Sequence, residues 1–263
     1  MGHPPSMPDA LALDIVPDLS APTLVLAFDG WNDAGESATG AVRFLNDAIQ
    51  SAPLGEIDPE TFYDFTVRRP EVHMDGEGAR HLEWPAYRFR YGTIGDAAIV
   101  TGCGGEPHLR WKTFAAEVRE VVRSVGIRRV VLLGAFLADV LYSLPVEVTG
   151  FGDPTRLAEL GVLPTGYEGP TGMVGVLAAE LPGAGVEVAS LWAGLPHYVA
   201  LSPNPRGMLA LLHKLSGYLD LPLDHSPLER DAAEYEEQVS KSIAGDPVLA
   251  EYVRELKKRD FAQ

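Results

Sequence analysis

Short apolar runs alternate with helical patterns along most of the chain. Apolar runs at 24–28, 97–101, 129–135 and 186–193 are typical of strands that are covered on both faces. Helices are predicted after them, over 38–50, 111–125, 171–181 and 205–219. This repeated order of strand and helix favours a mostly parallel central sheet between helices. The fold class expected is therefore α/β, with a helical appendage at the C-terminal end.

The stretch between the first two strand–helix units has a weaker pattern. Partial alternation over 57–67 predicts a strand, and Asp75-Gly76-Glu77-Gly78 predicts that 71–80 is a turn-rich loop. Residues 82–91 are expected to be extended, with Pro85 restricting them to the edge of a sheet. On that view Trp84, Tyr87 and Tyr91 would flank an exposed edge that a neighbouring chain could cover.

Composition shifts divide the chain into three parts. Residues 1–20 are a proline-rich lead-in, 21–221 form the α/β body, and 222–263 form a charged tail with two helices that each start near a proline. In the tail, Tyr235, Val239 and Ile243 recur at four-residue intervals, and Leu249, Val253 and Leu256 make a second narrow stripe. We expect both stripes to pack on the body or on a neighbouring subunit.

The charge balance excludes two classes of partner. The 263 residues contain 21 Lys and Arg against 37 Asp and Glu, a net charge of -16. Such a surface repels nucleic acid and anionic membranes. No apolar run is long enough for a membrane helix, and the start of the chain lacks the apolar core of a signal peptide. With Cys103 as the single cysteine, these features predict a cytoplasmic protein.

Polar residues cluster where predicted strands end or predicted helices begin. Asp29, Trp31, Asn32 and Asp33 follow the first buried strand, and Glu106, Glu168 and His197 stand at comparable positions farther along. In an open α/β sheet such positions converge on a ligand cleft. The alternative is that Asp29 and Asp33 cap the following helix, that Glu106 acts in the same way, and that His197 is a structural hydrogen bonder. Both interpretations stay open at this point.

Signatures of cofactor or metal chemistry are missing from the sequence. The Asp29–Asp33 loop lacks the spacing of a calcium loop, and Gly102-Cys103-Gly104-Gly105 lacks the pattern of a phosphate or dinucleotide loop. No nucleophile elbow of the Gly-x-Ser-x-Gly type occurs. We therefore expect no cofactor, no metal site and no catalytic residue.

Four segments together resemble the proteasome assembly chaperone family in its bacterial branch. They are Leu26-Ala27-Phe28-Asp29-Gly30-Trp31-Asn32-Asp33-Ala34-Gly35, Glu106-Pro107 with Trp111 and Phe114, Tyr167-Glu168-Gly169-Pro170-Thr171-Gly172, and Pro196-His197-Tyr198-Val199. The resemblance spans about residues 22–219. It implies a three-layer α/β/α body like that of nucleoside phosphorylases and peptidyl-tRNA hydrolases.

The resemblance also implies a function. We expect a chaperone-like, oligomeric protein-binding scaffold without catalysis, most simply a homotrimer as in bacterial relatives, with proteasome-related proteins as partners. The alternative is a small-ligand binder or an enzyme that uses the strand-end cleft around Asp29, Glu106, Glu168 and His197. Family members that dock into proteasome pockets end in a hydrophobic-Tyr-any motif, whereas this chain ends in Phe261-Ala262-Gln263. We therefore do not expect the tail to open a proteasome gate.

Overall fold

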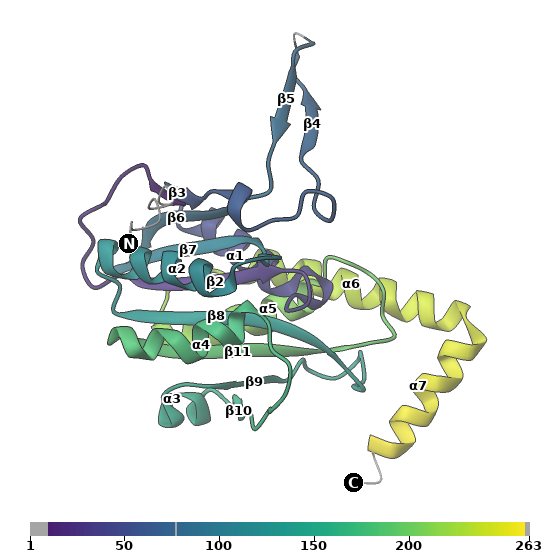
Figure 1. The fold of residues 1–263 in the computed structure, drawn as a ribbon. Coiled ribbons are helices and arrows are strands. Elements are labelled where there is room, and N and C mark those ends of the chain that lie inside the picture. The colour runs from purple at the N-terminus through teal and green to yellow at the C-terminus, as the bar shows by residue number, and fades with distance from the viewer. Residues whose placement is uncertain (1–9, 77, 261–263) are drawn as a thin grey trace.

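A nine-stranded sheet forms the centre of the computed structural model, which describes residues 10–76 and 78–260 (Figure 1). The strand order is β1-β3-β6-β7-β2-β8-β11-β9-β10, and the neighbours β7, β2, β8 and β11 run parallel. The strands of this sheet are β1 (Leu11–Leu13), β2 (Thr23–Asp29), β3 (Ala52–Ile57), β6 (Tyr87–Ile94), β7 (Ala97–Gly105), β8 (Arg129–Ala138), β9 (Val148–Phe151), β10 (Leu163–Pro164) and β11 (Glu187–Pro196). The predicted mostly parallel centre is confirmed.

Helices cover both faces of the sheet and complete three layers. The α-helices are α1 (Ser37–Ala48), α2 (Trp111–Val125), α3 (Pro154–Glu159), α4 (Met173–Glu180), α5 (Pro205–Leu219), α6 (Ser226–Gly245) and α7 (Pro247–Asp260), with short 3-10 turns at Ala34–Glu36, Pro59–Thr61 and Leu181–Ala184. Helices α1 and α5 pack on one face, and α2 and α4 pack on the other.

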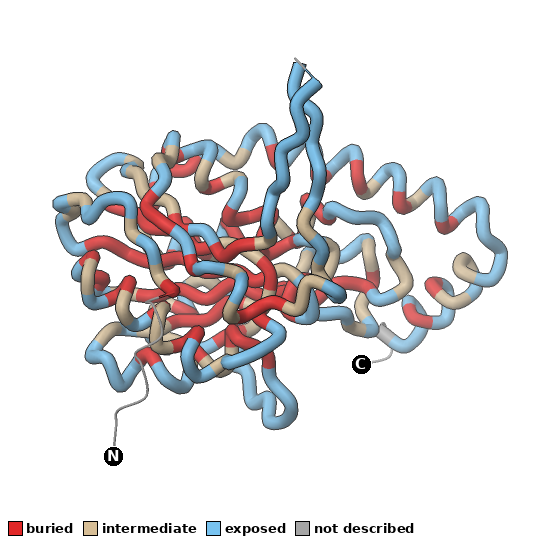
Figure 2. Tube along the Cα trace, turned by 45° about the horizontal axis from the view of Figure 1, so that its top comes forward, coloured by how far each residue is buried: buried red, intermediate tan, exposed pale blue. Residues whose placement is uncertain are grey.

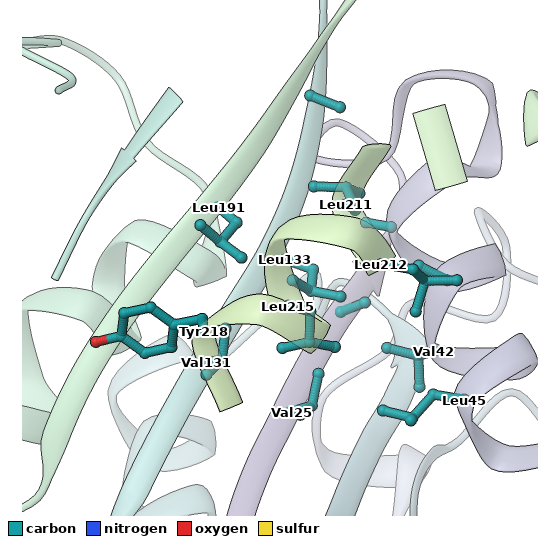
Figure 3. Close-up of a cluster of buried hydrophobic side chains, with 14 of the residues drawn as sticks. Val25, Val42, Leu45, Val131, Leu133, Leu191, Leu211, Leu212, Leu215 and Tyr218 are labelled. Atoms are coloured by element: carbon teal, nitrogen blue, oxygen red, sulfur yellow. The ribbon is translucent and has the colours of Figure 1, made fainter. Parts of the chain in front are cut away.

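The alternation of side chains along β2 explains why its run is apolar throughout. Val25 and Ala27 enter the cluster under α1 and α5, which includes Leu211 and Leu215 (Figure 3). Leu24, Leu26 and Phe28 point to the other face, toward α2 and α4. A strand with helices on both sides has no solvent-exposed face, so all positions over 24–28 are apolar.

Three local expectations between β3 and β7 are wrong. The strand expected over 57–67 does not form, because β3 already ends at Ile57. Asp58 then accepts a hydrogen bond from the Glu60 backbone N–H, and Pro59 starts a 3-10 turn. The expected loop over 71–80 is instead most of a hairpin of β4 (Glu71–Met74) and β5 (Arg80–Glu83) that stands off the body (Figure 1).

The third error concerns the sheet edge predicted around Pro85. Pro85 lies between β5 and β6, and β6 is an interior strand that pairs with both β3 and β7. Tyr87 is fully buried and Tyr91 is half-buried, so neither side chain flanks an open edge. Tyr87 and Tyr91 therefore offer no exposed edge for a neighbouring chain to cover.

The tail folds as two helices, as expected. The side chains of Tyr235, Val239 and Ile243 from α6 and of Val253 and Leu256 from α7 form a separate apolar cluster with Leu141. Leu249 of the second predicted stripe is half-buried beside them, so both stripes pack in this cluster with the loop after β8. The predicted lead-in residues 1–9 and the chain end at 261–263 lie outside the described residues.

Candidate functional site

Asp33 caps helix α1, although the short 3-10 turn Ala34–Glu36 lies between them in the sequence. Its Oδ1 accepts hydrogen bonds from the backbone N–H groups of Ala38 (2.6 Å) and Thr39 (3.2 Å), and its Oδ2 accepts one from the Thr39 hydroxyl (2.5 Å). The carboxyl group is buried, and this burial raises the pKa of Asp33 although the three hydrogen bonds act to lower it. The capping interpretation of Asp33 is confirmed.

Asn32 joins the loop after β2 to the loop after β7. Its side chain is fully buried, and Nδ2 donates to Oε1 of Glu106 at 2.7 Å. The same Glu106 oxygen accepts a hydrogen bond from the backbone N–H of Met173, the first residue of α4, at 2.6 Å. Glu106 therefore links three segments that are far apart in the sequence.

Gly172 closes over this pair. A Cβ atom at this position would lie 2.4 Å from both the Nδ2 and the Oδ1 of Asn32, and 2.5 Å from Oε1 of Glu106. Only a residue without a side chain lets the backbone approach so closely. Within the described chain, Oδ1 of Asn32 is buried and has no hydrogen-bond partner. The glycine of the Tyr167–Gly172 motif is thus explained by packing.

Asp29 is neutralised by a cation that the sequence did not reveal. Its Oδ2 lies 2.7 Å from Nη1 of Arg68, in a pair whose side chains are both partly exposed. Nearby, the Tyr63 hydroxyl donates to the carbonyl of Gly105 at 2.6 Å, and burial raises the pKa of Tyr63 above its ordinary value. Arg68 comes from the loop between β3 and β4, where its partner could not be foreseen from spacing.

Trp31 and Glu168 are solvent-facing. Trp31 is 64% exposed, although both of its neighbours in the motif, Asn32 and Asp33, are buried. Glu168 is exposed in the loop before α4, beside Tyr167, which is 66% exposed. The Tyr167 hydroxyl donates to the carbonyl of Pro170 at 2.8 Å and so folds this loop on itself.

His197 contacts the tail. Its Nε2 lies 2.9 Å from the Tyr252 hydroxyl of α7 and 3.4 Å from Oδ1 of Asp139, in the loop after β8. Tyr252 also donates a hydrogen bond to Asp139, and Arg259 of α7 lies 3.5 Å from the same carboxylate. The structure therefore places His197 in a polar contact between body and tail.

The seven candidate residues form separate groups. Asn32, Asp33 and Glu106 make internal hydrogen bonds, Asp29 makes an ion pair beside them, Trp31 and Glu168 face solvent, and His197 binds the tail. Among the residues that the structure describes, no three His, Cys, Asp or Glu side chains are grouped so that they could hold a metal ion. Burial raises the pKa of Cys103 to about 12, so its thiol stays protonated.

The family comparison places the chain in a known class. Residues 27–243 match the model of the PAC2 family, and the chain belongs to that family. The resemblance stated from the sequence motifs is thereby confirmed. Among curated proteins, none matches the sequence significantly.

Solved structures agree with this assignment. A PAC2 family protein from Streptomyces avermitilis is 39% identical, with a TM-score of 0.81 over 88% of this chain and 99% of that one. A proteasome-assembly chaperone homologue from Mycobacterium tuberculosis is also 39% identical, with a TM-score of 0.79 and the same coverage. Pyrococcus furiosus PbaB, an archaeal proteasome activator, shares the fold at 17% identity, with a TM-score of 0.69 over 88% of this chain and 97% of that one.

Over residues 10–76 and 78–260, no helix is both long enough and apolar enough to cross a bilayer.

Proposed function

We propose that this chain is a chaperone-like scaffold that binds proteasome subunits and works as a homo-oligomer. The observation that carries the proposal is the 39% identity to a proteasome-assembly chaperone homologue over 88% of this chain and 99% of that one. The match extends over nearly the whole of that chain, so it is not confined to one part of the fold.

The internal hydrogen bonds of Asn32, Asp33 and Glu106 support a binding role. Asn32 and Glu106 hold three loops together, and Asp33 holds the start of α1. This framework presents the indole of Trp31 on the surface, at the end of a rigid strand. An exposed aromatic side chain on a rigid support is the kind of residue that dominates protein interfaces.

Binding to unassembled proteasome α subunits from the same organism tests the proposal. Sedimentation velocity of the full chain mixed with these subunits should show a complex at micromolar concentration. Trp31→Ala should weaken it at least about tenfold, as expected for a hot-spot residue. Val248→Ala, at a side chain that is 80% exposed on α7, is the matched control and should bind normally. A complex that fails to form with the unaltered chain would contradict the proposal.

The oligomer proposed is a homotrimer. Three chains of 28.3 kDa give about 85 kDa. Light scattering at micromolar concentration should return this mass, whereas a mass near that of one chain would overturn this part of the proposal.

One observation favours the alternative, a small-ligand site at the strand ends. The buried Oδ1 of Asn32 lacks a partner among the described residues, and such an acceptor is a position for a ligand donor. Mass spectrometry of small molecules released from denatured, freshly purified protein tests this directly. A stoichiometric compound that is absent from Asn32→Leu protein would support the alternative, and its absence from both proteins would reject it.

A further inference from the structure

The β4–β5 hairpin has two chemically different faces. Directly opposed residues share a face, so the pairs Val72–Leu82 and Met74–Arg80 lie together, and the pairs Glu71–Glu83 and His73–His81 lie on the other side. Val72, Met74 and Leu82 are 56%, 60% and 58% exposed. One face of the hairpin is thus apolar with a single cation.

No described residue of the same chain covers that apolar face. Every described residue of both strands is exposed, and the hairpin projects away from the sheet (Figures 1 and 2). A two-stranded hairpin is at best marginally stable alone in water. Three large, exposed apolar side chains on one face of this hairpin are therefore a surface that a binding partner would cover.

A groove with complementary properties lies at the far end of β8 and β11. Its volume is about 430 Å³, and its walls include Phe136, Leu144, Val199 and Tyr235. The residues that line it come from the loop after β8, the end of β11 and helix α6. Phe136 and Leu144 are 38% and 45% exposed, so apolar surface is open to an incoming side chain.

The hairpin and the groove each carry one charged side chain without a partner in the described chain, and the two charges are opposite. Three charged residues line the groove, and two of them are already paired: Asp139 with Arg259, and Arg206 with Glu236. Within the described chain, the Glu147 carboxylate has no ion pair or hydrogen bond, and neither has the Arg80 guanidinium on the apolar face of the hairpin. The hairpin therefore carries a cation that could pair with the Glu147 carboxylate of the groove.

We propose that the β4–β5 hairpin of one copy docks its apolar face into this groove on the next copy, with Arg80 meeting Glu147. The hairpin and the groove are different surfaces, so each copy uses one of each. Such head-to-tail contacts form a ring when the rotation between copies closes, as the proposed trimer requires. The inference rests on the proposed homo-oligomer and deepens it by naming the contact.

A charge exchange tests the contact. The mass of the full chain is followed by light scattering over a dilution series. Arg80→Glu and Glu147→Arg should each raise the concentration at which the oligomer dissociates, by about tenfold or more. The double variant R80E/E147R restores an opposite pair and should return close to the original behaviour. Arg128→Glu, at an exposed residue just before β8, makes the same change in net charge as Arg80→Glu and should have no effect.

A second pair of variants tests the face of the hairpin that is used. Met74→Ser should weaken the oligomer, whereas His73→Ser, on the opposite face of the same strand, should leave it intact.

The outcomes separate this contact from the wider proposal. An oligomer that survives every single variant overturns the hairpin contact while the homo-oligomer stands. A chain that is monomeric throughout overturns both. Loss of binding to proteasome α subunits in Arg80→Glu without any change in mass would mean that the hairpin serves a client, and would also overturn docking to a second copy.

Discussion

The Nδ2 atom of Asn32 donates to Oε1 of Glu106 at 2.7 Å, across 74 positions of sequence. Glu106 Oε1 also receives the backbone N–H of Met173, so one carboxylate oxygen fixes the ends of two strands and the start of a helix. The hydrogen bonds of Asn32 and Glu106 therefore hold three segments of the fold together, and their contribution to the free energy of unfolding can be measured.

Removal of this carboxylate should destabilise the fold. Glu106→Ala leaves the buried Asn32 amide and the Met173 N–H without an acceptor, at a cost of about 1–3 kcal/mol in the free energy of unfolding. Glu106→Gln keeps an acceptor oxygen and should lose less. Urea unfolding measures both, with Glu168→Ala at an exposed position expected to stay within about 0.5 kcal/mol. Equal free energies of unfolding for Glu106→Ala and Glu168→Ala would contradict the stabilising role of the Glu106 hydrogen bonds.

The stability contributed at Asp33 should depend on pH. Burial raises the pKa of Asp33 in the folded chain above its unfolded value. Below the unfolded value of about 3.9 the group is protonated in both states, and no charge is buried by folding. As the pH rises from there through the raised folded pKa, ionisation of the unfolded chain favours unfolding, and stability is lost.

Asp33→Asn isolates this effect because an amide does not titrate. The difference in unfolding free energy between the natural chain and Asp33→Asn should fall between pH 4 and neutrality and then level off. A difference that rises with pH over this range would mean that the folded pKa is lowered, contrary to the structure.

Gly35 has no room for a side chain. Its φ is +57°, and a Cβ would lie 2.8 Å from Cβ of Asn204, the residue that caps α5. Gly35→Leu should therefore destabilise by roughly 1–3 kcal/mol from overpacking, with added backbone strain. Gly183→Leu is the matched control, since a Cβ there meets nothing within 4 Å. Melting temperatures that fall equally in both variants would contradict the close approach.

The Tyr252 hydroxyl should hold α7 on the body. Tyr252→Phe removes its hydrogen bonds to His197 and Asp139. Hydrogen exchange over 247–260 should then speed up, while exchange in β2 stays unchanged. Val248→Ala on the same helix provides the comparison. Unaltered exchange in Tyr252→Phe would show that the apolar contacts of Val253 and Leu256 suffice.

The buried elements were predictable from the sequence, because their side chains repeat with the period of the structure. Helix α2 shows the clearest case: its buried residues are Phe114, Ala115, Val118, Val121, Val122 and Val125, and Gly126 ends it at a positive φ. The β4–β5 hairpin was missed because its strands carry exposed charged and histidine side chains, and the glycines of its turn dominate the local pattern. The alternation of Val72, His73 and Met74 was the available signal.

The candidate site was predictable only where chain neighbours make the contacts. Asp33 caps residues five and six positions later, which sequence spacing can indicate. The pairing of Asp29 with Arg68 and of His197 with Tyr252 depends on how distant loops and the tail fold back, and no local pattern encodes that. Asn32 and Glu106 were predicted as candidate ligand residues, while their hydrogen bond to each other became evident only from the fold.

Assembly of the proteasome in the presence of this chain tests the central claim most directly. Purified, unassembled α and β subunits from the same organism are mixed with and without the full chain, and the particles formed are followed by native mass spectrometry. The account predicts that the chain is found on intermediates containing α subunits and that complete particles appear sooner. Intermediates that never carry the chain, together with an unchanged rate of particle formation, would contradict it.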